Sequence, residues 1–364
     1  MKENRGRPTA VPLFLFAEFF LLVLAAGPAA AQTAQTGNVF NPNISVIGNA
    51  LGFVGHNPVD NQPSLALKES EIGLQAIVDP YARADFFVTF GSQSGDVGIE
   101  EGTITFLTLP GDVIVKAGKF KGAFGKVNTE HPHVRQYADT PLVMLNLLGG
   151  EDGINDSGIS IARLIPMPSE IFLEATAQLL RGTSAGLFEA QTRNDVEPLF
   201  HLKAYKDLSE STNLELGGSW TQGNGIEGPG LHTTLAGVDV SFRWKPLRQG
   251  LYRSLLLRGE WMQSEREMAA GTTVRANGWY ALAQYQLGRR WNVGYRHDES
   301  DHADDATLRD RGDSAILTFL PSEFSMIRTQ LRRNRYDQIT GPVTATELLV
   351  QLQFVIGAHG AHPF

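Results

Sequence analysis

The sequence of 364 residues contains no cysteine. This absence excludes thiol catalysis, metal sites built on thiolates and a disulfide framework. An excess of positive charge is also missing, because 31 Lys and Arg are outnumbered by 39 Asp and Glu, for a formal net charge of −8 at pH 7. A nucleic-acid-binding protein needs a clustered positive face, so we expect no nucleic-acid partner.

Long apolar runs are absent after residue 31. A helix that crosses a bilayer needs about 18 to 20 apolar residues, so their absence excludes a membrane protein built from helices. Two classes remain open. One is a soluble exported β protein, and the other is a β-barrel that spans an outer membrane with strands of about 9 to 11 residues.

The one long apolar stretch of the chain lies within its first 31 residues. A run of apolar residues over 11–24 is followed by small residues over 27–31. This order is typical of a cleaved secretory signal peptide, which we place at 1–31, with the mature domain at 32–364. Glu18 within the run leaves an uncleaved anchor helix as the alternative. Basic residues precede the run at Lys2, Arg5 and Arg7.

The mature chain consists of short segments whose apolar and polar residues alternate with a period of two, which is the strand pattern. Their number, sixteen, is even, as a closed bacterial barrel requires. The predicted strands are 44–55, 65–78, 81–91, 99–108, 113–120, 157–165, 170–180, 198–206, 212–221, 232–244, 253–264, 275–287, 291–298, 308–320, 324–336 and 344–356.

The alternation separates each strand into an apolar face and a polar face. In the strand 232–244, Val238 and Val240 alternate with Asp239 and Arg243. An Arg or Lys facing lipid at mid-depth would cost about 2 to 4 kcal/mol, so in a barrel the charged face lines the interior. A soluble sandwich has the same period because it buries its apolar face. The alternation alone therefore leaves both architectures open.

The lengths of the connections favour the barrel. Short links such as 109–112, 166–169 and 321–323 alternate with long polar ones such as 121–156. Outer-membrane barrels show this asymmetry because short turns face the periplasm and long loops face outward. We therefore predict an all-β, 16-stranded antiparallel transmembrane barrel in the outer membrane of a Gram-negative-type bacterium. The terminal Phe364 is typical of bacterial barrels and predicts recognition by the barrel-assembly machinery.

The longest connection, 121–156, is the third outward loop by the up-and-down count. A barrel of sixteen strands leaves a water-filled lumen. We expect this loop to fold inward and narrow the lumen, with basic residues early and acidic residues late in the loop. The predicted constriction comprises Lys116, Lys119, Lys121, Lys126, Arg135, Glu151 and Asp152, and the predicted pore wall comprises Arg243, Arg258, Arg296, Asp239 and Glu260.

The octamer 118–125, Gly-Lys-Phe-Lys-Gly-Ala-Phe-Gly, resembles the motif with which the phosphate-selective porin O and P family enters its third loop. The resemblance implies a sixteen-stranded anion channel that assembles as a homotrimer. Ala123 stands where that family has Pro, and a Lys-rich ladder is not evident. The other charged residues expected to face inward nearly cancel, which argues against phosphate selectivity; they are Arg83, Lys203, Arg328, Arg332, Glu71, Asp85, Glu174, Glu215 and Asp298.

Nine histidines are the remaining feature of interest, and several of them lie close to carboxylates in sequence. Imidazole mixed with carboxylate suits borderline divalent ions such as Zn²⁺. The His-rich tail and the His-Pro-His stretch are loosely similar to outer-membrane proteins labelled as zinc-regulated receptors. The alternative is that these are ordinary solvated surface loops. The candidate ligands are His131, His133, His297, His302, His359 and His362.

The sequence therefore predicts a porin, a passive channel for small hydrophilic or ionic solutes, with the lipid bilayer as its surroundings and no cofactor. One alternative is a barrel linked to the binding or uptake of divalent metal, and another is a non-conducting structural or adhesive barrel. We expect no enzymatic activity, because no motif fixes a catalytic geometry among His201, His232, Ser219 and Ser241. A plugged active transporter is excluded because it needs about 22 strands around an occluding domain.

Overall fold

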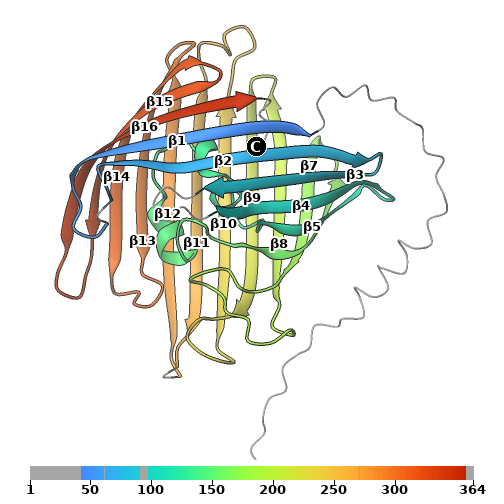
Figure 1. Cartoon of the computed structure of the whole chain (residues 1–364), viewed down its shortest axis with the longest axis vertical. Coiled ribbons are helices and arrows are strands. Elements are labelled where there is room, and N and C mark those ends of the chain that lie inside the picture. The colour runs from blue at the N-terminus through green and yellow to red at the C-terminus, as the bar shows by residue number, and fades with distance from the viewer. Residues whose placement is uncertain (1–41, 61, 91–96, 270, 358–364) are drawn as a thin grey trace, which may run out of the picture. The chain divides into compact units, whose positions relative to one another are not determined.

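The computed structural model describes residues 42–60, 62–90, 97–269 and 271–357, and the predicted signal peptide and the His-rich tail lie outside these ranges. The described chain forms one closed barrel in which each strand pairs with its sequence neighbours and β1 pairs antiparallel with β16 (Figure 1). The strands are β1 (Asn43–His56), β2 (Leu65–Asp79), β3 (Ala82–Phe90), β4 (Val97–Leu109), β5 (Val113–Lys121), β6 (Asn155–Pro166), β7 (Ile171–Leu180), β8 (Glu197–Ser209), β9 (Thr212–Asn224), β10 (His232–Trp244), β11 (Leu255–Glu267), β12 (Thr273–Gln286), β13 (Trp291–Asp301), β14 (Arg309–Ser322), β15 (Ser325–Tyr336) and β16 (Val343–Gly357).

The sixteen predicted strands are confirmed, and their boundaries differ from the observed ones by three residues at most. The largest differences arise where pairing continues beyond the alternating segment. For example, β9 extends to Asn224 and β13 to Asp301. Backbone pairing does not require apolar side chains, so these strands extend past the band in which lipid would impose the alternation.

Burial of the two strand faces is the reverse of that in a soluble protein. In β15, Arg328 and Arg332 are each 5% exposed, whereas Ile327 and Leu331 are 39% and 51% exposed. A soluble sandwich would bury its apolar face and expose its charged one. The observed order therefore excludes the sandwich and fits a barrel whose outer surface contacts hydrocarbon.

Val238, near the middle of β10, provides a test of this orientation, because it is 55% exposed on the apolar face. We expect Val238→Arg to lower the free energy of unfolding by about 2 to 4 kcal/mol. The measurement is guanidinium-induced unfolding of the protein inserted in lipid vesicles. Ser241→Arg is the matched control, because Ser241 lies on the opposite face of the same strand. Equal losses from both substitutions would contradict the assignment of the faces.

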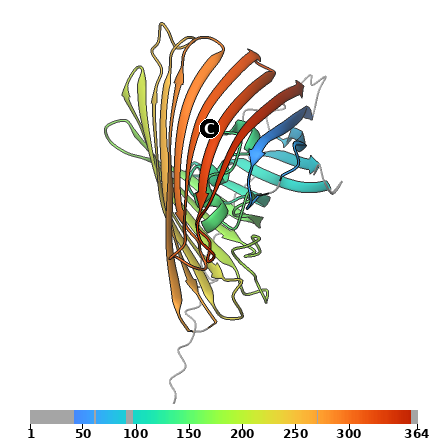
Figure 2. The same ribbon diagram turned by 90° about the vertical axis from the view of Figure 1, so that its left-hand side faces the viewer.

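The connection between β5 and β6, residues 122–154, carries the helical turns η1 (Val127–Thr129) and η2 (Pro132–Val134) and the helix α2 (Leu142–Leu147). We call it the β5–β6 segment. Its apolar side chains make up much of the core, in which Phe124 and Met144 are fully buried among side chains of the strands. Helix α2 contacts β11, β12, β13 and β14, and in Figure 2 its green ribbon is seen beside these orange strands. None of the helices among the described residues is long and apolar enough to cross a membrane.

Candidate functional site

Two cavities lie beside the β5–β6 segment. The small cavity, of about 290 Å³, is lined by the nine strands from β2 to β10 and by the start of the segment. The large cavity, of about 820 Å³, is lined by the rest of the segment, by the six strands from β1 to β6 and by β14, β15 and β16. Both contain charged side chains of both signs. In the small cavity these are Arg83, Lys116, Lys121, Lys126, Lys203, Asp85, Glu101, Glu174, Glu215 and Asp239.

The predicted constriction residues divide between the two cavities. Lys116 and Lys126 line the small cavity, Lys121 lines both, and Lys119 lines the large one. Most of these ammonium groups have a partner. Lys126 Nζ lies 2.8 Å from a Glu215 oxygen. Lys121 is buried with its Nζ 2.9 Å from Glu100, and Lys119 donates to a backbone carbonyl oxygen at 2.8 Å. Two of the four ammonium charges, those of Lys121 and Lys126, are therefore compensated by carboxylates.

The other predicted constriction residues differ in their surroundings. Arg135 is buried and donates to the Glu130 carbonyl oxygen at 3.2 Å, so its guanidinium holds the segment's own backbone. Glu151 is exposed, and one of its carboxylate oxygens lies 3.0 Å from Lys68 Nζ. Asp152 is exposed on the lining of the large cavity. Of these three residues, the two acidic ones are exposed and Arg135 is not.

Predicted wall residues attach the segment to the barrel. Arg258 donates to both carboxylate oxygens of Glu130 at 2.8 and 2.9 Å. Arg296 lies 2.8 Å from Asp139, and the guanidinium of Arg296 stacks over the Tyr137 ring at 4.3 Å. These two arginines lie on the buried face of their strands, as the alternation predicts, but they are covered by the segment. Their direct contact is with protein.

The acidic wall residues have separate roles. Glu260 accepts hydrogen bonds from the backbone amides of Lys126 and Val127, at 3.0 and 2.7 Å, and from the Tyr280 hydroxyl at 2.6 Å. It therefore holds the first turn of the segment. Asp239 is buried beside the small cavity, whereas Arg243 is exposed at the end of β10.

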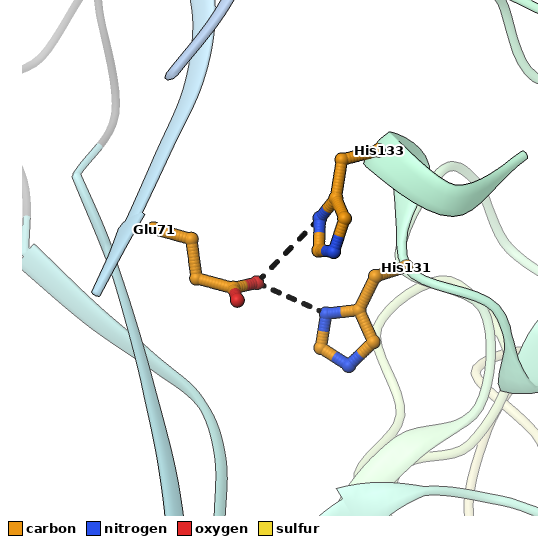
Figure 3. Close-up of side chains that lie close together, drawn as sticks. All are labelled: Glu71, His131 and His133. Carbon is orange, nitrogen blue, oxygen red and sulfur yellow. Dashed lines mark hydrogen bonds and ion pairs between the residues drawn. The ribbon is translucent and has the colours of Figure 1, made fainter. Parts of the chain in front are cut away.

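His131 and His133, at the turn η2, meet Glu71 of β2 (Figure 3). We call these three buried residues the histidine cluster. Glu71 Oε2 lies 3.1 Å from Nδ1 of His131 and 3.9 Å from Nδ1 of His133. Both histidines are among the metal ligands predicted from the sequence, whereas Glu71 was not predicted as a ligand. The signal that could have found it was the alternation, which already placed Glu71 on the inner face.

A β-bulge adds two further carboxylates to this cluster. The β3–β4 ladder skips Glu100 between the paired residues Ile99 and Glu101. An extra residue in one strand re-aims its side chains, and here both reach His131, with Glu100 Oε1 3.4 Å from Nδ1 and Glu101 Oε1 2.7 Å from Nε2. Burial disfavours the imidazolium, but hydrogen bonds to Glu100, Glu101 and Glu71 raise the pKa of His131 well above its ordinary value.

The remaining candidate metal ligands lie apart from this cluster. Nδ1 of His297 is 2.9 Å from Asp313, and Nε2 of His302 is 3.0 Å from Asp310. Each is a separate pair with one carboxylate. His359 and His362 lie outside the described residues.

Comparison with known proteins addresses the fold. No protein-family model matches the chain. An uncharacterized protein of Aquifex aeolicus (strain VF5) is 28% identical over 346 residues, which span 85% of this chain and 72% of that one.

Several solved structures share the barrel at low sequence identity. An anion-selective porin from Comamonas acidovorans superposes with a TM-score of 0.57 at 12% identity, over 86% of this chain and 98% of that one. The barrel has the porin fold. The outer-membrane channel DcaP of Acinetobacter baumannii also gives a TM-score of 0.57, at 11% identity, over 87% of this chain and 96% of that one. OprB of Pseudomonas putida gives 0.57 at 12% identity, over 87% and 94%. Such low identities establish the porin fold and leave the solute open.

Proposed function

We propose that this protein is an outer-membrane porin, a passive water-filled channel for small hydrophilic or ionic solutes. The observation that carries the proposal is the inverted burial of the strands, with charged side chains on the enclosed face and apolar ones on the outer face. A barrel of sixteen strands has room for an aqueous passage. The neighbours described as an anion-selective porin and as an outer-membrane channel support the same function.

In this proposal the β5–β6 segment folds into the lumen and forms its constriction. It bonds to Glu71 and Glu101 on β2 and β4 and to Arg258, Arg296 and Arg328 on β11, β13 and β15. These side chains all lie on the enclosed face, so the segment spans between distant parts of the wall. Solutes would then pass through the space lined by the small and large cavities.

The charges of the small cavity predict weak ion selectivity. Its basic and acidic side chains are similar in number, and Lys126 with Glu215 and Lys203 with Glu174 form ion pairs at 2.8 and 2.9 Å. A ring of one sign is needed to favour ions of the other sign. The octamer's resemblance to the phosphate-selective porins therefore supports the place of the constriction more than a preference for phosphate.

The surroundings of the channel follow from the same proposal. We infer that a signal peptide at 1–31 directs export and is removed before Gln32. We also infer that the barrel-assembly machinery recognises Phe364 and inserts the protein into the outer membrane. A homotrimer is the assembly we expect, and a Vibrio cholerae outer-membrane protein of the same fold is described in a trimer form. We also expect no enzymatic activity. The Ser219 hydroxyl lies 2.8 Å from Nδ1 of His201 and also accepts a hydrogen bond from the Gly125 amide at 2.9 Å. We therefore infer that this pair positions the start of the β5–β6 segment.

Conductance in a planar bilayer tests the channel. Purified protein should give stable open-channel steps in potassium chloride, with a small reversal potential under a salt gradient. A protein that inserts, shows the folded mobility on gels and stays electrically silent would contradict the proposal and favour the non-conducting structural barrel.

Charge reversal at Lys126 tests the position of the filter. In Lys126→Glu the carboxylates of Glu215 and Asp239 lose their nearby ammonium, so we expect the cation-to-anion permeability ratio to rise about twofold or more. Lys245→Glu is the matched control, because Lys245 is exposed just after β10. An unchanged reversal potential in Lys126→Glu would remove the small cavity from the conduction path.

A further inference from the structure

We propose that the histidine cluster, with Glu100 as a fourth ligand, is a binding site for a divalent transition metal ion, with Zn²⁺ preferred. The site joins the turn η2 of the β5–β6 segment to β2 and β4 of the wall. Its ligands would be one carboxylate oxygen each of Glu71 and Glu100, Nδ1 of His131 and an imidazole nitrogen of His133.

The distances between the ligand atoms fit such an ion. Zn²⁺ bonds nitrogen and oxygen at about 2.0 to 2.2 Å, so a tetrahedral site places its ligand atoms about 3.3 Å apart. Around Nδ1 of His131 the observed separations are 3.1 Å to Glu71 and 3.4 Å to Glu100, and Glu71 lies 3.9 Å from Nδ1 of His133. The atoms offered by Glu71, His131 and His133 all lie within 4.8 Å of one another. The separations around Nδ1 of His131 are thus near the tetrahedral value, and closing the shell around Glu71, His131 and His133 requires movements of up to about 1.5 Å.

The negative charge of the carboxylates around His131 also favours binding of a cation. Three carboxylates, those of Glu71, Glu100 and Glu101, converge on His131, and among the ion pairs of the described residues Lys121 brings one ammonium to them. With His131 neutral, as a metal ligand must be, two negative charges are left for a divalent ion. Buried carboxylates are stable only when they are paired or coordinate a metal.

Two carboxylate oxygens of the cluster are unused. Within the described residues, Oε1 of Glu71 and Oε2 of Glu100 are buried and accept no hydrogen bond. Glu71 itself is fully buried. A buried acceptor without a hydrogen bond destabilises the fold, so these oxygens indicate a missing partner.

Glu101 occupies the position of an outer-shell group. Its Oε1 lies 2.7 Å from Nε2 of His131, on the side of the ring opposite Nδ1. A metal-bound histidine commonly donates its other N–H to a carboxylate, which fixes the tautomer and the ring orientation. The pair therefore has the arrangement of a carboxylate–histidine–metal unit, and His131 and Lys121 border the small cavity, which provides an entry path.

Two imidazoles and two carboxylates select among ions. Ca²⁺ and Mg²⁺ prefer oxygen ligands, whereas this mixed set suits Zn²⁺ and its neighbours in the first transition row. Bound there, the ion would tie one end of the segment to β2 and β4, while Arg258 and Arg296 hold the rest on the opposite wall.

The test is metal binding by the full-length protein in detergent, purified without a polyhistidine tag and stripped with EDTA. We expect calorimetry to show one Zn²⁺ per chain, and Co²⁺ to give the intense visible absorption of a tetrahedral site. Glu71→Gln and His133→Ala should weaken binding by about 100-fold or more, and Glu101→Gln by about 10- to 100-fold. The matched control is His297→Ala combined with His302→Ala, which should bind as the wild type does.

Folding of each variant is checked by its heat-modifiable mobility on gels. If Glu71→Gln fails to fold, the wild-type Co²⁺ spectrum and Glu101→Gln decide the question. Absence of saturable binding to the wild type, binding unchanged in Glu101→Gln, or binding lost in the His297 and His302 control would each overturn the proposal. The measurement needs no current, so a failed channel and a failed metal site are distinguishable.

Discussion

Replacing Asp139 with alanine is expected to lower the free energy of unfolding by about 3 kcal/mol or more, because three buried donors lose a charged acceptor. Arg296 and Arg332 then keep Asp298 and Glu347 as close carboxylate partners. The Asp139 carboxylate accepts hydrogen bonds from Arg296 at 2.8 Å, from Arg332 at 3.2 Å and from Gln330 at 2.8 Å. All three donors are buried on the enclosed face of β13 and β15. Unfolding by guanidinium in lipid vesicles, followed by tryptophan fluorescence, measures the loss.

The same variant should also increase single-channel conductance, because Asp139 fixes the β5–β6 segment to the wall. Asp152→Ala is the matched control, since Asp152 belongs to the same segment but is exposed. A loss in Asp139→Ala no larger than in this control would show that the arginines do not depend on Asp139.

Acid should reproduce part of this effect. Burial alone would raise the pKa of Asp139, but Arg296 and Arg332 outweigh it and hold the pKa at about 2, below the ordinary value of 3.8. A carboxyl whose pKa is lower in the folded state stabilises the fold fully above its unfolded pKa. That contribution should be lost as pH falls from about 4 to 2 and should be absent in Asp139→Ala, which unfolding at a series of pH values would show.

Truncation of Phe124 to alanine should cost about 3 to 5 kcal/mol, the usual range for a fully buried aromatic. The Phe124 ring lies against Gly237 of β10, where a Cβ atom would come within 3.2 Å of the ring. Because Gly237 has no side chain, the ring packs onto the backbone of the wall and fills space that no neighbour can reclaim. Urea or guanidinium unfolding in vesicles measures the change.

Phe124→Leu is the graded control, because it keeps much of the apolar volume and should lose clearly less than alanine. If alanine and leucine cost the same small amount, the ring would not be what holds the segment to β10. The two anchors hold different parts of the wall: Asp139 contacts β13 and β15 through Arg296, Arg332 and Gln330, and Phe124 contacts β10 at Gly237.

Strand positions were predictable because they obey a local rule. The alternation of Val238 and Val240 with Asp239 follows from the chain alone, since each side chain in a strand points to the face opposite its neighbour. The inner position of Arg258, Arg296 and Glu71 could be predicted for the same reason. What these side chains bond to could not, because the partners are far away in sequence.

The histidine cluster illustrates the limit. His131 and His133 are conspicuous in sequence, but so are His297 and His302, and the chain alone does not rank them. Glu71 lies 60 residues before His131, and its contact depends on where η2 meets β2. The contribution of Glu100 depends on a bulge, which no alternation predicts.

By itself the sequence determined the number of strands, their order and the polarity of their two faces, because strand geometry has a period of two and hydrocarbon tolerates few charges. Only the tertiary structure decided that Arg258 and Arg296 anchor a segment, that Lys121 and Lys126 are already paired, and that Glu71 joins two histidines. The reason is physical: contacts across an enclosed space depend on barrel closure and on the path of one long connection, and neither leaves a local signature in the chain.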